Sequence, residues 1–539
     1  MKATSDSSPL DELDEETIEY LSKLKVTDPD HDMERIEDSK DNLLKDCYEW
    51  ILQNRLLQEW RHSDTCSLLW IIGGPGKGKT MLMIALAREL SIKVPGNSPP
   101  VAKFFCQSTD LRLNNAVAIL RGLIWKLATN QPRLARIFRR KYKSDQSMLS
   151  GPNAVFALFS VLTLMLNEQP GTTILIDALD ECDAGPGRSQ LLNLITKDAS
   201  SSSKSKWLLS SRNNPDIKQQ LKSESQMLSL ELDNDEHISQ AVNAYIQQKT
   251  IELSTKKGYN QDLVDNVKKE LMEKSNSTFL WVALACKNLL RVSTRKTLSA
   301  LQKLPPGLEP LYQRMIEEIL QLNDEEDGQF CFQILRTMCQ VFRPLSVEEL
   351  IPTAELPGDF LVLDNLRELI DDCSSFVTVR QGNIYFVHQS AKDYLTSSGA
   401  QKLYSGGILE GQGMIVDRSL SAMSMTLQQD MCKLKHPGSL ARTTEIGDGL
   451  KAIRYMCCFW VDHLVEYFDG NPLDGQLYKE DGGPVQRFLL QHLLHWLEAL
   501  SLFGEYNRGV LAILSLESLI PVILPTIYFG IITNFYQGR

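Results

Sequence analysis

The chain has 539 residues, 43% of them hydrophobic and 23% charged, which is enough to bury the cores of three or four domains. Its formal net charge of −11 argues against a broad nucleic-acid-binding face, so we expect no nucleic acid partner. The acidic, polar start excludes a secretory signal or transit peptide, and eleven scattered cysteines without a C-x-x-C pair fit reduced thiols rather than a zinc site. We therefore expect a cytoplasmic protein.

The first 33 residues are acidic and polar, and this composition predicts a disordered leader. Apolar residues then recur at helical spacing between residues 36 and 60, among them Leu43, Trp50 and Trp60. We expect one amphipathic helix there, leading into the first strand.

A phosphate-binding loop follows. Residues 73–80 read G-G-P-G-K-G-K-T and match G-x-x-x-x-G-K-[ST], between an apolar strand-like run at 68–72 and a helical stretch at 81–90. This context disfavours the alternative of a Gly/Lys surface turn. Glycines let consecutive N–H groups turn toward one anion, and the helix N-terminus adds positive charge. The predicted nucleotide-binding residues are Gly73, Gly74, Pro75, Gly76, Lys77, Gly78, Lys79 and Thr80.

Within this loop, Lys79 should reach the β- and γ-phosphates, and the Thr80 hydroxyl should join the coordination of Mg²⁺. The expected ligands are therefore Mg²⁺ and either ATP/ADP or GTP/GDP, because no readable motif selects the base. Strand-like runs at 101–106, 173–179, 207–211 and 227–232 alternate with helical stretches at 116–127 and 154–166. This alternation predicts an α/β P-loop NTPase fold with a mainly parallel sheet and crossover helices.

Acidic residues end the third of these strands, in T-T-I-L-I-D-A-L-D-E-C. Asp177 should lie at the carboxyl edge of the sheet beside the phosphate-binding loop and hold Mg²⁺ through its water shell. Asp180 and Glu181 follow within reach of a water attacking the γ-phosphate, which a carboxylate there can orient or deprotonate. The alternative is a solvated helix start, where acidic residues favour the dipole.

An arginine ends the next strand, in K-W-L-L-S-S-R-N-N-P. Arg212 should lie at the same edge as Lys79 and Asp177, where its guanidinium can sense the terminal phosphate. The alternative is a surface arginine at the end of a strand.

The remainder of the chain is mostly helical. Helical patterns cover 236–247, 263–272, 279–290 and 308–322, and then 330–339 and 366–372. Ser346 with Glu349 forms a capping-box pattern, and two short strands flank residues 381–383 as a hairpin. Three helices and a hairpin predict a winged helix, and its acidic helices favour a packing module over a DNA reader.

These motifs in this order resemble the NACHT class of STAND P-loop NTPases, in the fungal vegetative-incompatibility and nephrocystin-like branch related to NLR proteins. The resemblance extends from about residue 28 to about 517. It rests on the motifs above and on R-I-E-D-S-K-D-N-L-L-K-D-C-Y-E-W-I-L (35–52), F-F-C-Q-S-T-D (104–110), F-L-W-V-A-L-A-C-K-N-L (279–289), P-P-G-L-E-P-L-Y-Q-R-M (305–315) and F-V-H-Q-S-A-K-D-Y-L (386–395).

The resemblance implies a nucleotide-gated switch that diphosphate holds closed and exchange opens, often with self-association. It also implies that His388 faces the β-phosphate, against the alternative of a core histidine. We expect a leader (1–33), the NTPase (34–235), a helical domain (236–325), a winged helix (326–400), a helical region (401–517) and an apolar tail (518–539). The effector domain and repeats typical of the family are missing from this plan, and Ala178 replaces a glycine common in its D-G-L-D-E motif.

Two helical stripes in the region 419–505 contain Trp460 and Trp496, and we interpret both as core. His492 and His495 have metal-ligand spacing but no accompanying carboxylate or cysteine. Pro521, Pro525 and Gly530 in the uncharged tail favour a buried or disordered segment over a membrane anchor.

Two functions remain open at this stage. The first is a regulatory switch with slow Mg²⁺-dependent hydrolysis, acting in fungal non-self recognition or cell-death signalling. The second is a non-signalling scaffold or decoy that binds nucleotide for stability. The expected partners are nucleotide, further copies of the chain, or related NACHT proteins.

Overall fold

A computed structural model describes residues 13–40, 43–64, 67–92, 100–201, 205–222, 227–233, 235–321, 325–404, 407–432, 446–470, 478 and 482–520. The chain divides into two compact units, Met1–Leu311 and Tyr312–Arg539. The described part also contains four short 3-10 helices, η2 (Gln146–Leu149), η3 (Leu179–Glu181), η4 (Thr294–Lys296) and η5 (Gly358–Leu361).

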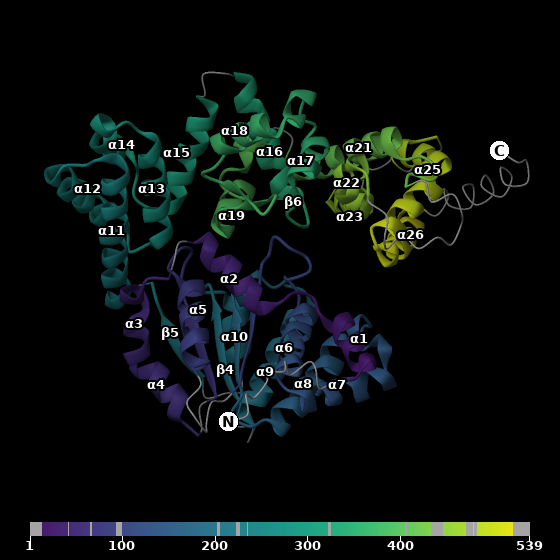
Figure 1. Cartoon of the computed structure of the whole chain (residues 1–539), viewed down its shortest axis with the longest axis horizontal. Coiled ribbons are helices and arrows are strands. Elements are labelled where there is room, and N and C mark those ends of the chain that lie inside the picture. Colours follow the sequence, from purple (N-terminus) through teal and green to yellow (C-terminus); the bar gives the residue numbers. More distant parts are fainter. Residues whose placement is uncertain are drawn as a thin grey trace, which may run out of the picture. The chain divides into compact units, whose positions relative to one another are not determined.

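The first unit is built on a five-stranded parallel sheet (Figure 1). Its strands are β1 (Leu68–Ile72), β2 (Val101–Phe105), β3 (Thr173–Asp177), β4 (Lys206–Ser211) and β5 (Met227–Glu231). They lie in the order β2-β3-β4-β1-β5, so that β4 separates β1 from β3. Every position of β1, β2 and β3 is buried, as expected for apolar runs in a sheet covered on both faces. The five predicted strands and the α/β P-loop fold class are confirmed.

Crossover helices surround this sheet (Figure 1). They are α5 (Lys79–Leu90), α6 (Ala116–Asn130), α7 (Pro132–Ser144), α8 (Ala154–Glu168), α9 (Pro186–Ser200) and α10 (Pro215–Lys222). Leu123, Ile124 and Leu162 from these helices are fully buried together with Trp70 and Trp207 of the sheet. All parallel strands end at the same edge, so the residues that follow β1, β3 and β4 are brought together there.

The N-terminal segment is ordered where disorder was predicted. Residues 15–39 form α1 (Glu15–Leu24) and α2 (Pro29–Ser39), so the prediction of a disordered leader is wrong for this part. Leu21 and Leu24 are buried, and the acidic side chains that suggested disorder pair with basic ones, as Glu16 does with Arg139 of α7. The acidic average composition of residues 1–33 gave no sign of the apolar face of α1 that carries Leu21 and Leu24.

The helix expected over residues 36–60 is also divided. It consists of the end of α2, then α3 (Lys45–Gln53) and α4 (Arg55–His62). Asn54 ends α3, and its side chain accepts a hydrogen bond from the Leu56 amide to cap α4. Asn54 is thus the C-cap of α3 and the N-cap of α4, which explains why the two helices are separate.

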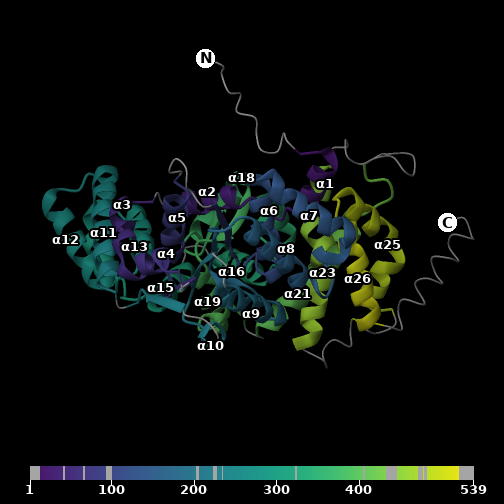
Figure 2. The same cartoon turned by 90° about the horizontal axis from the view of Figure 1, so that it is seen from below.

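A helical part completes the first unit (Figure 2). It contains α11 (Glu236–Lys257), α12 (Gln261–Lys274), α13 (Phe279–Arg291) and α14 (Thr297–Lys303), and α15 (Leu308–Leu320) carries the chain into the second unit. Gly258 ends α11 with a φ of 66°, the left-handed conformation that terminates many helices at glycine.

The second unit contains the helices and the hairpin that the sequence predicted, and one further short strand, β6. They are α16 (Glu325–Gln340), β6 (Leu345–Ser346), α17 (Val347–Ala354), α18 (Leu363–Asp372), β7 (Val377–Arg380), β8 (Asn383–Phe386) and α19 (Gln389–Thr396). The predicted capping box is present, because the Glu349 amide donates to Ser346 Oγ and the Ser346 amide donates to Glu349 Oε2. The three strands form an antiparallel sheet in the order β6-β8-β7.

Further helices complete this unit. They are α20 (Ala400–Leu403), α21 (Ile408–Thr426), α22 (Asp448–Ala452), α23 (Arg454–Gly470), α25 (Pro484–Leu502) and α26 (Tyr506–Leu519). Among them, α21, α23, α25 and α26 lie together in both views (Figures 1 and 2). Trp460 and Trp496 are almost fully buried with ring centroids 5.6 Å apart, which confirms that the two stripes are core.

The described part of the chain contains no cluster of three or more His, Cys, Asp or Glu residues that could hold a metal, so His492 and His495 lack further ligands there. It also contains no helix long and apolar enough to cross a membrane. Residues 521–539 of the predicted tail lie outside the described residues.

Candidate functional site

The phosphate-binding loop joins β1 to α5 at the carboxyl edge of the sheet. Gly76 and Gly78 have φ values of 72° and 84°, which glycine adopts without steric cost. A Cβ atom on Gly76 would lie 2.7 Å from Leu280 Cβ, so a larger residue would not fit. Gly78 precedes the first helical residue, Lys79, and the positive end of α5 therefore lies at the loop. This glycine cradle at a helix N-terminus fits a polyphosphate.

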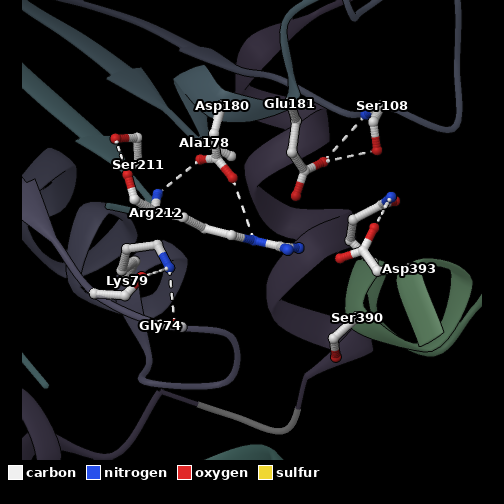
Figure 3. A network of polar contacts seen from close by, with 12 residues as sticks. Gly74, Lys79, Ser108, Ala178, Asp180, Glu181, Ser211, Arg212, Ser390 and Asp393 are labelled. Atoms are coloured by element: carbon white, nitrogen blue, oxygen red, sulfur yellow. Dashed lines mark hydrogen bonds and ion pairs between the residues drawn. The ribbon is translucent and has the colours of Figure 1, made fainter. Parts of the chain in front are cut away.

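The Lys79 side chain lies over the same loop (Figure 3). Its ammonium donates hydrogen bonds to the carbonyls of Gly73 and Gly74, at 2.5 and 3.0 Å. Burial lowers the pKa of Lys79, while the nearby carboxylates of Asp180 and Asp177 act in the opposite direction. Lys79 therefore lies near Asp177 and Asp180, as the sequence predicted.

Asp177 ends β3 and is 2% exposed. Its carboxylate accepts a hydrogen bond from Ser210 Oγ of β4 at 2.5 Å, and the Thr80 hydroxyl lies near enough to influence its pKa. Burial raises the pKa of Asp177, whereas the hydroxyls of Ser210 and Thr80 and the charge of Lys79 lower it. A hydroxyl and a carboxylate oxygen close together beside the phosphate loop are the hard donors that Mg²⁺ requires.

The residue after Asp177 has a strained backbone. Ala178 has a φ of 52°, a left-handed conformation that disfavours residues other than glycine. The Ser210 hydroxyl accepts a hydrogen bond from the Ala178 amide at 2.9 Å, so it bridges the strained residue and the Asp177 carboxylate. Sequence reasoning missed Ser210, which directly precedes the Ser211–Arg212 pair at the end of β4.

Asp180 and Arg212 form a pair across the end of the sheet (Figure 3). The Arg212 amide donates to Asp180 Oδ1 at 3.0 Å, and Arg212 Nε lies 3.3 Å from Asp180 Oδ2. The predicted placement of Arg212 beside the acidic residues therefore agrees with the structure. Asp180 therefore contacts the guanidinium and the backbone amide of the same residue, one with each carboxylate oxygen.

Glu181 contacts the segment that follows β2 instead. Its Oε2 accepts hydrogen bonds from the Ser108 amide at 3.1 Å and from Ser108 Oγ at 3.5 Å (Figure 3). Burial first, and then the negative charge of Asp180, raise the pKa of Glu181 to about 7, while the Ser108 amide lowers it. The sequence reasoning did not identify Ser108, although it lies in a polar run directly after an apolar strand, the signal that identified Asp177.

Two residues of the loop make contacts that the motif did not predict. The Gly74 amide donates to Asp233 Oδ1 at 2.7 Å, and the Lys77 ammonium donates to the carbonyls of Asn276 and Ser277. These contacts join the loop to the segments after β5 and after α12.

His388 lies in the second unit and precedes α19. Its Nδ1 accepts a hydrogen bond from the Ser390 amide at 3.1 Å and lies 2.8 Å from Ser390 Oγ. The ring therefore caps α19 locally. The role of His388 toward the β-phosphate stays a prediction.

Residues 46–212 match the protein family described as "Nephrocystin 3, N-terminal". The chain is also 42% identical over 525 residues, or 93% of its length, to the vegetative incompatibility protein HET-E-1 of Podospora anserina. These matches confirm the resemblance to the fungal vegetative-incompatibility and nephrocystin-like branch. The chain spans 38% of the length of that relative.

Solved structures of two archaeal ATPases also match. One is a STAND protein with a tetratricopeptide repeat sensor from Pyrococcus horikoshii, with a TM-score of 0.37 and 15% identity over 85% of this chain and 57% of that chain. The other is a Walker-type ATPase of Pyrococcus abyssi, with a TM-score of 0.32 and 14% identity over 63% of this chain and 93% of that chain.

Proposed function

We propose that the chain binds a nucleoside tri- or diphosphate with Mg²⁺ and uses it as a regulatory switch of the NACHT type. The observation that carries the proposal is the meeting of Lys79, Thr80 and Asp177 at one edge of the sheet, beside a glycine loop that opens α5. A helix N-terminus, an ammonium and hard oxygen donors together meet the needs of a polyphosphate bound with a divalent cation.

The residues of the site take separate roles in this proposal. The amides of residues 76–80 and the Lys79 ammonium bind the β- and γ-phosphates, for which Lys79 exchanges its bonds to the Gly73 and Gly74 carbonyls. Thr80 and Asp177 hold Mg²⁺, Asp177 through water. When bound, the cation neutralises charge that develops on the phosphate oxygens. Arg212 senses the terminal phosphate from the end of β4.

We assign the role of orienting and deprotonating the attacking water to Glu181 rather than to Asp180. Both carboxylate oxygens of Asp180 already contact Arg212, one through its amide and one through its guanidinium. Glu181 has a pKa of about 7, in the range that suits a general base at neutral pH, and only one of its oxygens contacts Ser108. We therefore propose slow hydrolysis in which Glu181 orients and deprotonates water, and Asp180 positions Arg212.

The second unit supplies the regulatory part of the proposal. We interpret α16 to β8 as a winged helix, a packing module rather than a DNA reader because α18 carries Asp364, Glu368, Asp371 and Asp372. The similarity to HET-E-1 supports a role in incompatibility signalling, with further copies of the chain or related proteins as partners.

Calorimetric titration with ATP, ADP, GTP and GDP, with and without Mg²⁺, tests the proposal. Lys79→Ala should weaken binding by about ten- to a hundredfold, since each charge-assisted hydrogen bond contributes about 1.5–3 kcal/mol. Lys269→Ala is the matched control, because the Lys269 side chain is 73% exposed on α12.

The outcomes separate the candidate functions. Equal nucleotide affinity in Lys79→Ala and wild type would refute the site. Tight Mg²⁺-dependent binding without hydrolysis or nucleotide exchange would favour the alternative function, a scaffold that binds nucleotide only for stability.

A further inference from the structure

One lysine of the phosphate-binding loop faces the helical part rather than the phosphates. The Lys77 ammonium donates hydrogen bonds to the carbonyl of Asn276 at 2.9 Å and to the carbonyl of Ser277 at 3.0 Å. Burial lowers the pKa of Lys77, and the charge of Asp233 opposes that effect. Both carbonyls belong to the short connection between α12 and α13, two hundred residues further along the chain.

This α12–α13 connection has an unusual backbone. Asn276 and Ser277 have φ values of 48° and 50°, two successive left-handed residues that are not glycine. Such residues persist only where the surroundings hold them, because the Cβ atom approaches the following carbonyl. The Lys77 ammonium contacts the carbonyls of both residues. It is therefore placed to hold this pair in its strained conformation.

The start of α13 also contacts the phosphate-binding loop. The Leu280 amide, in the first turn of α13, points at the carbonyl of Gly76 at 3.5 Å, and the Gly78 backbone lies against the Phe279 ring. Ser277 Oγ lies 2.7 Å from Ser239 Oγ, which connects the same segment to α11. The loop that should wrap the phosphates and the start of the helical part are thus packed without space for a side chain between them.

We infer that Lys77 is a positioning residue that couples the phosphate-binding loop to the α12–α13 connection. The inference rests on the proposed nucleotide binding. A bound polyphosphate fixes the backbone of residues 76–80, and with it the Cα atom of Lys77. The fixed ammonium then stabilises the left-handed pair Asn276–Ser277, so the helical part responds to the nucleotide. Coupling of this kind is mutual, so the ordered connection strengthens nucleotide binding by the same factor.

Lys77→Met tests this coupling, because methionine keeps the unbranched stem and removes the ammonium. Hydrogen exchange of peptides spanning residues 274–281 is measured by mass spectrometry, with and without ADP and Mg²⁺, and ADP affinity by calorimetry. In the wild type, ADP should slow exchange of these peptides several-fold. In Lys77→Met the slowing should largely disappear, while ADP affinity falls less than tenfold. Lys269→Met on α12 should behave as wild type.

A second pair of variants keeps the test independent of any general loss of stability. Asn276→Gly with Ser277→Gly removes the left-handed strain, so Lys77→Met should change ADP affinity less in that background than in the wild-type background. A purely additive effect would contradict the coupling.

The other outcomes are equally decisive. Retained ADP-dependent slowing in Lys77→Met would overturn the inference, as would a loss of affinity equal to that of Lys79→Ala, which would make Lys77 a phosphate ligand. A wild type that binds ADP without slowing exchange at 274–281 would refute the coupling alone. A wild type that binds no nucleotide would refute the proposed function and the inference together.

Discussion

Two adjacent serines at the end of β4 allow a sharp test of how Asp177 is held. Ser210 and Ser211 are both fully buried, but consecutive residues of a strand point to opposite faces. Ser210 Oγ donates to Asp177 and accepts from the Ala178 amide. Ser211 Oγ accepts from Trp70 Nε1 at 2.9 Å and donates to the Arg212 carbonyl. Each serine therefore makes two hydrogen bonds, and one of the two made by Ser210 involves a predicted metal ligand, Asp177.

The two alanine substitutions should differ in size. Ser210→Ala removes a hydrogen bond to a charged group, which contributes about 1.5–3 kcal/mol, and leaves the buried Ala178 amide without this partner, which costs about 1–3 kcal/mol. Because the two effects share one atom and are not additive, we expect about 3 kcal/mol of destabilisation. Ser211→Ala loses bonds between neutral groups and should cost about 1–2 kcal/mol.

Of the two substitutions, only Ser210→Ala should change the Mg²⁺ dependence of ADP affinity. Burial already raises the pKa of Asp177, and the Ser210 bond is one of the interactions that lower it. Without that bond the pKa rises further, so the carboxylate is protonated over a wider range below neutral pH. We expect Mg²⁺-dependent ADP affinity to fall by about tenfold or more, since 1.4 kcal/mol corresponds to tenfold, and to fall more at pH 6 than at pH 8.

Urea unfolding followed by tryptophan fluorescence, together with ADP titrations at pH 6 and pH 8 with and without Mg²⁺, measures both effects. Ser211→Ala is the control, because it perturbs the same strand without touching Asp177. Equal Mg²⁺ and pH dependence in the two variants would refute the argument that Ser210 holds Asp177 in its ionised form.

Further predictions concern the other acidic residues and the leader. Hydrolysis should rise with pH around a midpoint near 7, because the raised pKa of Glu181 keeps its carboxyl protonated below that pH; Glu181→Gln should bind nucleotide normally and lose turnover. Ser108→Pro removes the amide that lowers this pKa and should move the midpoint to higher pH, whereas Ser108→Ala keeps the amide and should shift it less; pH–rate profiles of both variants decide this. Asp180→Asn should keep binding but lower turnover, because Arg212 loses its charged partner; unchanged single-turnover rates would contradict that role. Leu24→Ala deletes a fully buried side chain of α1 and should cost about 2–5 kcal/mol of docking energy, seen as faster proteolysis of residues 13–40.

Much of the α/β architecture was predictable because its signals are local. The strands of the first unit are short segments of five or six residues, most clearly apolar in β1, and the phosphate loop has a fixed spacing. Parallel strands share one carboxyl edge, which was enough to place Asp177 and Arg212 near the loop. The Ser346–Glu349 capping box was predictable for the same reason, since both partners lie within one helical turn.

The features that the sequence did not predict depend on the order of strands in the sheet, or on a few apolar residues within an otherwise acidic segment. Ser210 reaches Asp177 because β4 lies beside β3, and Ser108 reaches Glu181 because β2 lies on the other side of β3. No pattern within a single segment contains either pairing. The acidic average of the leader concealed Leu21 and Leu24, whose burial anchors α1.

The central claim is that residues 73–80, with Asp177, form a Mg²⁺–nucleotide site. Mass spectrometry of the nucleotide released on denaturing the purified protein tests it most directly. We predict about one nucleoside di- or triphosphate per wild-type chain, with its base identified by mass, and little or none in Lys79→Ala. A wild type that carries no nucleotide, and that takes up none from a mixture of ATP, ADP, GTP and GDP with Mg²⁺, would contradict the account.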